Sequence, residues 1–183
     1  LKPFIQEGRI EAGLDEAGRG CLAGPVVVAA VILDPNQPIE GIDDSKKLTA
    51  DQRTALAQEI KSKAIAWSVS TQSSEVIDKI NVLQATFLGM HDCINQLETK
   101  PEFLLIDGNR FNPYEGIEHE CIIKGDQKLQ SIAAASILAK VHRDLIMDEL
   151  DAEFPNYLWK DNKGYPTPSH RTAVMKYGPT SHH

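Results

Sequence analysis

Gly13-Leu14-Asp15-Glu16-Ala17-Gly18-Arg19-Gly20 places two adjacent carboxylates and a glycine-rich turn at the end of an apolar run. Successive side chains of a strand point to opposite faces, so Asp15 and Glu16 are expected on different faces of a sheet. One face can then hold a metal ion while the other fixes a second ion or a water molecule. The glycines of Gly18-Arg19-Gly20 let the backbone approach an anion, and the guanidinium can bind a phosphate through two hydrogen bonds. The plain alternative is a strand that ends in a polar turn.

Outward from this stretch, strand and helix signals follow each other along the chain. The predicted strands are Arg9–Leu14, Ala23–Leu33, Ile65–Ser70, Phe103–Ile106 and His119–Ile123. The predicted helices are Ala50–Lys63, a short one opened by Ser73 or Ser74, Val82–Leu97, Leu129–Leu150 and a short one near His170–Lys176. No internal repeat or linker divides these elements, which therefore predict one α/β domain, residues 1–183, with a mixed sheet.

Local signals support several of these elements. The apolar run Val26–Leu33 has the length of a buried strand and is too short to span a membrane. Thr49 and Gln52 predict a capping box at the start of the first helix. Along the long helix, apolar spacing predicts one buried face through Ile132, Ala135, Leu138, Ala139 and Leu145. Arg143 and Asp144 are expected to form an ion pair at the protein surface, without a catalytic role.

Composition is that of an ordinary globular protein, with 42% hydrophobic and 25% charged residues. The three widely spaced cysteines fit free thiols in a reducing compartment, and the N-terminus shows no signal-peptide pattern. A cytoplasmic protein is therefore expected. The formal net charge of −7 argues on average against a nucleic-acid partner. Carboxylates that hold divalent cations would reverse this sign locally.

Three predicted strands lead into acidic residues, namely Asp15 with Glu16, then Asp107, then Asp126 after Lys124-Gly125. If these strands are neighbours, the carboxylates converge at one edge of the sheet, where they would repel each other unless cations lay among them. Oxygen ligands suit Mg²⁺ or Mn²⁺, which bind jointly with a substrate phosphate. Two such ions are the usual machinery for in-line attack on a phosphodiester. Taken one at a time, each site is more simply interpreted as a turn or a helix cap, but three such sites together are harder to explain in that way.

Two further polar segments suit a nucleic-acid substrate. Ser45, Lys46 and Lys47 combine hydroxyl and ammonium groups on a loop and are predicted to contact backbone phosphates. Tyr165 presents a ring on a loop stiffened by Gly164 and Pro166, where it could stack on a sugar or base. The alternatives are a solvated loop in the first case and a tyrosine packed against the core in the second.

The motifs, taken in order, resemble type 2 ribonuclease H, the bacterial ribonuclease HII family. The resemblance begins with Gly13–Gly20 and Leu22–Val26 and covers the chain from about Arg9 to its end. The later matching segments are Asp44–Leu48, Asn81–Thr86, Ile106–Asn109, Lys124–Asp126 with Ser131–Lys140, Gly164–Thr167 and His170. One departure is Cys21, where many members of the family carry proline. This change removes no ligand.

The resemblance implies a ribonuclease H-like fold, a mixed five-stranded sheet flanked by helices with a C-terminal helical extension from about residue 150. It implies an endonuclease that hydrolyses the RNA strand of RNA–DNA hybrids and cuts 5′ of single ribonucleotides embedded in duplex DNA. The products would carry 5′-phosphate and 3′-hydroxyl ends. It also implies two ions, Mg²⁺ or Mn²⁺, in the presence of substrate.

The same resemblance assigns roles to individual residues. The backbone of Gly18, Arg19 and Gly20 would read the ribose 2′-hydroxyl. Tyr165 would sense the junction between ribonucleotide and deoxyribonucleotide. The implied metal ligands and catalytic residues are Asp15, Glu16, Asp107 and Asp126.

Three alternatives remain at this point. Ribonuclease HIII shares the core, but the Gly164-Tyr165 loop and the lack of a long N-terminal extension argue against it. The Gly18-Arg19-Gly20 turn argues against a DNA nuclease or transposase of the same fold. The presence of all four carboxylates argues against a non-catalytic binding module. A monomer without membrane contact is the default expectation, and the sequence identifies no replication-clamp contact.

Overall fold

The computed structural model describes residues 1–183 and contains one mixed five-stranded sheet. The strands are β1 (Glu11–Ala17), β2 (Val26–Ile32), β3 (Ala66–Gln72), β4 (Phe103–Asp107) and β5 (Glu118–Ile122). Their order across the sheet is β3-β2-β1-β4-β5. β2 runs antiparallel to both β1 and β3, whereas β1, β4 and β5 run parallel. The predicted mixed sheet of five strands is confirmed.

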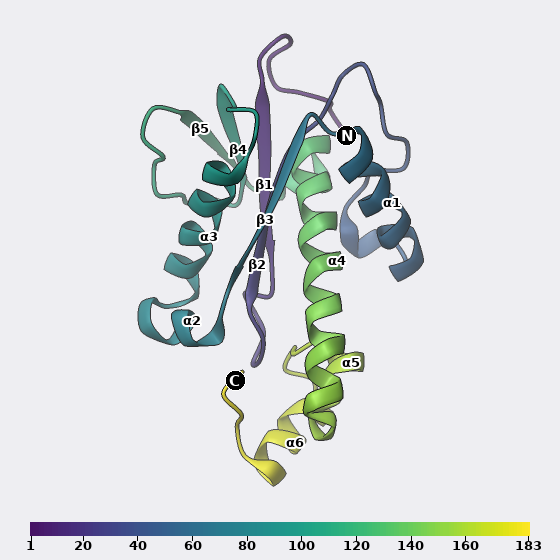
Figure 1. The fold of residues 1–183 in the computed structure, drawn as a ribbon, viewed down its shortest axis with the longest axis vertical. Coiled ribbons are helices and arrows are strands. Elements are labelled where there is room, and N and C mark those ends of the chain that lie inside the picture. The colour runs from purple at the N-terminus through teal and green to yellow at the C-terminus, as the bar shows by residue number, and fades with distance from the viewer.

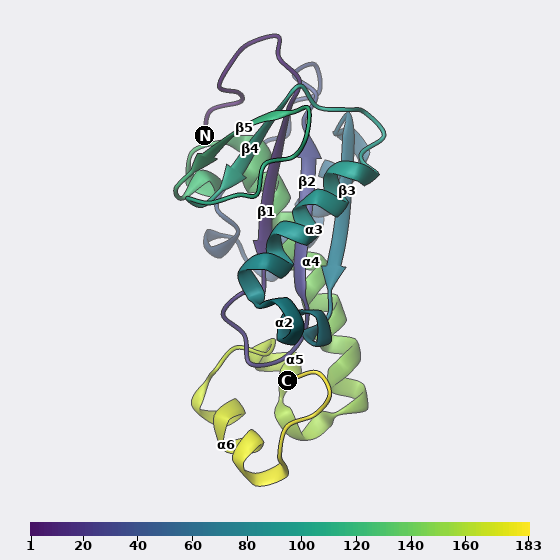
Figure 2. The same ribbon diagram turned by 90° about the vertical axis from the view of Figure 1, so that its left-hand side faces the viewer.

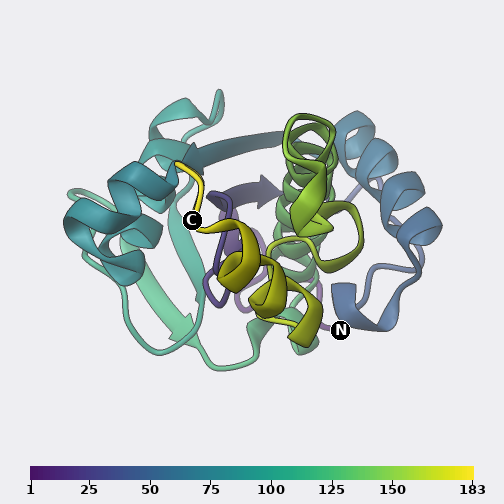
Figure 3. The same cartoon turned by 90° about the horizontal axis from the view of Figure 1, so that it is seen from below.

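Helices cover both faces of this sheet. The α-helices of the fold are α1 (Ala50–Lys63), α2 (Ser74–Ile80), α3 (Val82–Gln96), α4 (Gln130–Glu153), α5 (Trp159–Asn162) and α6 (Pro168–Tyr177). In Figures 1 and 3, α3 lies on one side of the sheet, and α1 and α4 lie on the other. Figure 2 shows α5 and α6 beyond the end of the sheet, on the side where the loop after β1 emerges. This arrangement brings the C-terminal segment next to that loop.

β2 is buried on both faces because the two helical layers enclose it. Its even-numbered residues, from Val26 to Ile32, pack with Phe87 and Met90 of α3. Its odd-numbered residues pack with Ile60 of α1 and with Ile137 of α4. This double burial explains why the strand is apolar throughout, without polar alternation.

The backbone of α4 rests directly on β1 at Gly13. A Cβ atom at this position would lie 2.3 Å from the carbonyl carbon of Ser131 and 2.5 Å from the backbone nitrogen of Ile132. Only glycine therefore permits this approach. Asp15 is the next residue on the same face of β1, so the contact at Gly13 sets the distance between Asp15 and α4.

Elements with strong local signals match their predictions closely. The helix Ala50–Lys63 is confirmed at both ends, and its capping box is formed. Thr49 Oγ1 accepts from the Gln52 N–H at 3.1 Å, and Gln52 Oε1 accepts from the Thr49 N–H at 2.8 Å. Ser73 caps α2, as one of the two alternatives predicted. β1, in contrast, runs three residues beyond the predicted Leu14, because residues 15–17 continue to pair with β2.

Two predictions about the long helix are wrong in its C-terminal half. Leu145, expected on the buried face, is 58% exposed, and Arg143, expected at the surface, is fully buried. Asp144 pairs with Lys140 at 3.0 Å. The loop after β1 and the C-terminal segment cover this side of α4, and their carbonyl groups accept hydrogen bonds from Arg143. No helix of the fold combines the length and apolar character that crossing a membrane requires.

Candidate active site

The three strand ends predicted to carry acidic residues are neighbours in the sheet. β1, β4 and β5 lie side by side and parallel, with Leu14 opposite Ile106 and Asp107 opposite Ile122. Asp15 and Asp107 therefore leave adjacent strands at the same level. Asp126 lies four residues after β5, in the short 3-10 turn η2 (Gly125–Gln127). Asp107 Oδ1 accepts a hydrogen bond from the backbone N–H of Gly125 at 2.8 Å, which ties this turn to β4.

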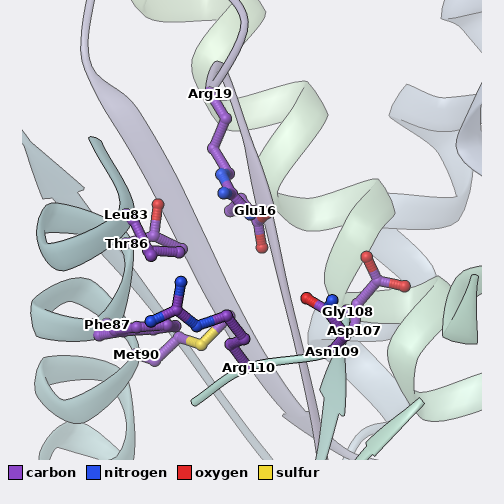
Figure 4. A pocket seen from close by; sticks show the side chains of 10 residues that line it. All are labelled: Glu16, Arg19, Leu83, Thr86, Phe87, Met90, Asp107, Gly108, Asn109 and Arg110. Atoms are coloured by element: carbon purple, nitrogen blue, oxygen red, sulfur yellow. Dashed lines mark hydrogen bonds and ion pairs between the residues drawn. The ribbon is translucent and has the colours of Figure 1, made fainter. Parts of the chain in front are cut away.

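Asp15 and Glu16 point to opposite faces of β1, as strand alternation predicts. Asp15 is 5% exposed and faces α4. Glu16 faces α3 and also lines a smaller hollow of about 250 Å³ together with Asp107. Figure 4 shows the Arg19 side chain running toward Glu16, with Asp107 and Arg110 following the neighbouring strand. The closest atoms of the Arg19–Glu16 ion pair are 3.3 Å apart.

One cavity of about 590 Å³ collects most of the residues singled out in the sequence. All four carboxylates line it, as do the Gly18–Gly20 turn and Tyr165. Lys47 is the exception, because it is exposed and does not line the cavity. The lining residues are Asp15, Glu16, Ala17, Gly18, Arg19, Gly20, Ser45, Lys46, Arg53, Asp107, Lys124, Asp126, Ser136, Lys140 and Tyr165.

The carboxyl groups lie close together and are partly shielded from solvent. Burial raises the pKa of Asp15 well above its ordinary value of 3.8, and the charges of Glu16 and Asp107 raise it further. Burial also raises the pKa of Glu16, against the opposing effect of the Arg19 guanidinium. Burial and then Asp107 raise the pKa of Asp126. Because the charges of Glu16, Asp107 and Asp126 all raise the pKa of Asp15, these carboxyl groups lie close enough to share positive counter-charges.

Basic side chains border this acidic edge. Lys46 Nζ lies 3.8 Å from Asp126 Oδ2 and 3.8 Å from Asp44 Oδ1. The ammonium group is mostly exposed, so it remains accessible to a phosphate at the rim of the cavity. Lys124 and Lys140 line the same cavity. The cavity is therefore mixed in charge although the chain as a whole carries −7.

Several residues in or beside the cavity were not singled out as site residues in the sequence. Asp44, the first residue of the matching segment Asp44–Leu48, does not line the cavity but is buried beside it and accepts a hydrogen bond from Gln127 Nε2 at 3.2 Å. Ser136 Oγ lies 2.9 Å from Ser45 Oγ. Ser136 and Lys140 are four residues apart on α4, and this spacing on one helical face is the signal that could have found them.

Tyr165 lies between the cavity and the C-terminal segment. Burial raises its pKa, and the neighbouring thiol of Cys21 raises it further. The Lys140 ammonium lies 5.3 Å from the centre of its ring. His170, which is fully buried, contacts the Tyr165 carbonyl through Nδ1 at 3.0 Å. The ring is thus held at the cavity wall, partly exposed.

The donor set fits divalent cations that prefer oxygen ligands. Glu16 Oε2 is buried without any hydrogen-bond partner, so it is free to act as a ligand. The side chains do not form a closed metal centre in advance, because no three or more His, Cys, Asp or Glu residues are grouped tightly enough. An open arrangement suits Mg²⁺, which keeps several of its waters and is bound jointly by a few carboxylates and substrate phosphate.

The sheet order and its acidic edge define an enzyme of the ribonuclease H type. The structure resembles the ribonuclease H2 of Pyrococcus horikoshii with a TM-score of 0.78 and 27% identity, covering 93% of this chain and 89% of that one. It resembles the ribonuclease HII of Archaeoglobus fulgidus, solved in complex with PCNA, with a TM-score of 0.77 and 29% identity. That match covers 94% of this chain and 92% of the other.

Sequence comparison narrows the class to one family. The chain matches the family Ribonuclease HII over residues 12–183. It is 56% identical to the ribonuclease HII of Parabacteroides distasonis over 183 residues, all of this chain and 92% of that protein. Identity to the ribonuclease HII of Bacteroides thetaiotaomicron is 54%, with the same coverage. The chain therefore belongs to the ribonuclease HII family, an endoribonuclease family that acts on RNA–DNA hybrids.

Proposed function

We propose that this protein incises duplex DNA on the 5′ side of a single embedded ribonucleotide, in addition to cleaving RNA–DNA hybrids. The observation that carries the proposal is the shared cavity, in which the four carboxylates lie together with the Gly18–Gly20 turn and Tyr165. A site that only cuts continuous hybrids needs the carboxylates and phosphate contacts. A site that selects one ribose also needs groups that test that ribose and the sugar next to it.

In the proposed complex, Asp15, Glu16, Asp107 and Asp126 hold two divalent cations, Mg²⁺ or Mn²⁺. When bound, such ions supply an activated water and charge stabilisation for the departing 3′-oxygen. Oxygen chemistry, mutual proximity and the unpartnered Glu16 Oε2 support this ligand set. The Gly125 N–H that binds Asp107 Oδ1 fixes one carboxylate orientation before any ion arrives.

The remaining cavity residues would bind and orient the nucleic acid. The backbone of Gly18–Gly20 reaches the ribose 2′-hydroxyl, because the two glycines remove side chains that would keep it away. Lys46 and Ser45 contact the backbone phosphates from the rim. The Tyr165 ring stacks on the deoxyribose that follows the ribonucleotide. The phosphodiester on the 5′ side of the ribonucleotide is thereby placed at the carboxylates only when the bound ribonucleotide has a 2′-hydroxyl and the nucleotide after it lacks one.

Asp107→Asn tests the ligand assignment. The change keeps shape but removes the charge, so cleavage should fall about a thousandfold or more while the fold is kept. Rates are measured in magnesium on a duplex with one ribonucleotide and on an RNA–DNA hybrid, with circular dichroism to monitor the fold. Asp151→Asn on α4, outside the cavity, is the matched control and should cleave at the wild-type rate. If Asp107→Asn cleaves at the wild-type rate, Asp107 is not a metal ligand.

The same two substrates separate the proposed activity from its nearest rival. Cleavage of the continuous hybrid without incision of the single-ribonucleotide duplex would favour a function of the ribonuclease HIII kind. Tyr165→Ala should then have equal effects on every substrate. Under the proposed function, this variant loses activity mainly on the single-ribonucleotide duplex.

A further inference from the structure

Arg143 is a buried cation without an acidic partner. The side chain is fully buried in the middle of α4, and no carboxylate lies within ion-pair distance of it. Its guanidinium instead donates to three backbone carbonyl groups. Nε donates to Pro25 at 2.9 Å, Nη2 to Ala23 at 2.8 Å, and Nη1 to Lys163.

These carbonyl groups belong to the two loops that carry the proposed sugar-reading groups. Pro25 and Ala23 end the loop that begins with Gly18-Arg19-Gly20, and Lys163 directly precedes Gly164-Tyr165. The two loops also meet without Arg143, since the Leu22 N–H donates to the Gly164 carbonyl at 2.8 Å. The guanidinium therefore fills the corner between two loops that are far apart in the sequence.

Glycines let the two loops close around this guanidinium. A Cβ atom on Gly18 would lie 2.3 Å from Arg143 Nε, and one on Gly24 would lie 2.9 Å from its Nη2. A Cβ atom on Gly164 would lie 2.3 Å from the Ala23 carbonyl oxygen. The guanidinium carbon also lies 5.7 Å from the centre of the Tyr165 ring. Arg143 thus contacts both loops and lies beside the Tyr165 ring, which lines the cavity.

A guanidinium suits this position because its N–H groups form a rigid planar fork that reaches three separate acceptors. A lysine ammonium is a compact charge on a flexible stem and cannot span the same three carbonyl groups. Burying an unpaired cation destabilises the fold unless its hydrogen bonds are satisfied. The three carbonyl groups offset that cost only while both loops keep their present spacing.

We propose that Arg143 is a positioning residue that locks the Gly18–Pro25 loop and the Lys163–Tyr165 segment into one rigid substrate-reading unit. The inference rests on the proposed function and extends it from the residues that touch the sugars to the one that sets their spacing. A fixed distance between the Gly18–Gly20 backbone and the Tyr165 ring lets the site test two adjacent sugars at once. Loss of the lock should weaken this test more than it weakens phosphodiester cleavage itself.

Arg143→Lys is the principal test, because it keeps the positive charge and removes the fork. Activity on the single-ribonucleotide duplex should fall about 10- to 100-fold, the cost typical of a small misplacement. Activity on the continuous hybrid should fall much less. Adding Tyr165→Ala to Arg143→Lys should cause little further loss of selectivity, because residues that act as one unit are not additive.

Hydrogen exchange gives a readout that does not depend on cleavage. In Arg143→Lys, the amides of the Gly18–Pro25 loop and of the 163–165 segment should both exchange faster, while those of β4 stay protected. Gly164→Ala provides a second route to the same state, since its Cβ would force the Ala23 carbonyl away while Arg143 remains. If Arg143→Lys fails to fold, Gly164→Ala should show the loss of selectivity and the exchange pattern expected of Arg143→Lys.

Arg9→Lys is the matched control. Arg9 binds Glu11 through Nε and Nη2 and stacks on Phe103 at 3.7 Å, near the start of β1 and away from the cavity. The control should lower stability without changing the ratio of activities on the two substrates. Equal losses by Arg143→Lys on both substrates, or faster exchange in only one loop, would overturn the proposal.

The two experiments separate a failure of the proposed activity from a failure of the role of Arg143. A wild-type protein that leaves the single-ribonucleotide duplex intact contradicts the proposed function. Exchange in Arg143→Lys still decides whether the two loops are coupled. Wild-type incision with unchanged exchange and selectivity in Arg143→Lys contradicts the role of Arg143 alone.

Discussion

Lys46 and Lys47 are adjacent, yet only Lys46 reaches the cavity. Lys46 lies between Asp44 and Asp126 at its rim, whereas Lys47 faces solvent in the same 3-10 turn, η1 (Ser45–Lys47). The two residues have the same charge and nearly the same sequence context. Comparing substitutions at these two lysines therefore distinguishes a specific phosphate contact from a general effect of positive charge.

Lys46→Ala should raise the KM for the single-ribonucleotide duplex about three- to tenfold and lower the slope of log KM against log salt by about 1. Lys47→Ala should change both quantities much less. The comparison is made by steady-state kinetics at three or more salt concentrations. Equal effects of the two substitutions would show that Lys46 makes no localised phosphate contact.

The acidic residues that the sequence predicted to converge do so in the fold, and the signal for each of them is visible in one segment. Asp15, Asp107 and Asp126 each come after a short apolar run in the sequence, and the structure brings the three strands concerned together. Arg143 was misplaced because its three acceptors come from segments more than 100 residues before it and 20 residues after it. Helical periodicity shows which face a residue occupies, but it does not show that another loop covers that face.

At the scale of elements, the packing of α4 against β1 positions the site. The contact at Gly13 leaves no room for a side chain, because the nearest atoms belong to the α4 backbone and cannot rotate away. β1 begins at Glu11, two residues after the predicted Arg9, whereas α1 was predictable at both ends, with its capping box. The end of β1 was not, since Asp15 and Glu16 remain paired to β2 despite their low strand propensity.

Gly13→Ala should lower the free energy of unfolding by about 2–4 kcal/mol, because the added methyl group meets rigid backbone. Activity should fall as well, since α4 must move away from the face that carries Asp15. Chemical denaturation and cleavage rates measure the two effects. Gly20→Ala, where a Cβ atom meets nothing within 4 Å, should change stability by less than about 0.5 kcal/mol. A stable Gly13→Ala protein would show that β1 and α4 separate easily.

At the scale of the whole molecule, the acidic cluster links stability to pH and to divalent cations. The pKa values of Asp15, Glu16 and Asp126 are higher in the folded state than their ordinary values of 3.8 and 4.5. The folded state therefore binds more protons. The acidic cluster therefore contributes most to the free energy of unfolding below about pH 4. This contribution is lost as the pH rises through the folded-state pKa values.

Asp15→Asn should accordingly raise the melting temperature of the metal-free protein near pH 8, by about 2–4 °C for a gain of about 1 kcal/mol. The difference from wild type should shrink as the pH falls toward 4. Magnesium should stabilise the wild-type protein and have a smaller effect on the variant. Thermal unfolding with and without magnesium tests all three expectations. A lower melting temperature for Asp15→Asn at pH 8 would contradict the description of the cluster as mutually repelling.

The chemical nature of the cut ends tests the central claim most directly. A duplex DNA with one ribonucleotide is incubated with the protein and magnesium, and both new ends are identified by mass spectrometry at nucleotide resolution. A carboxylate site that activates water predicts a single incision immediately 5′ of the ribonucleotide, leaving a 3′-hydroxyl and a 5′-phosphate. An incision on the 3′ side of the ribose that leaves a 2′,3′-cyclic phosphate would mean attack by the 2′-hydroxyl, and would contradict the account.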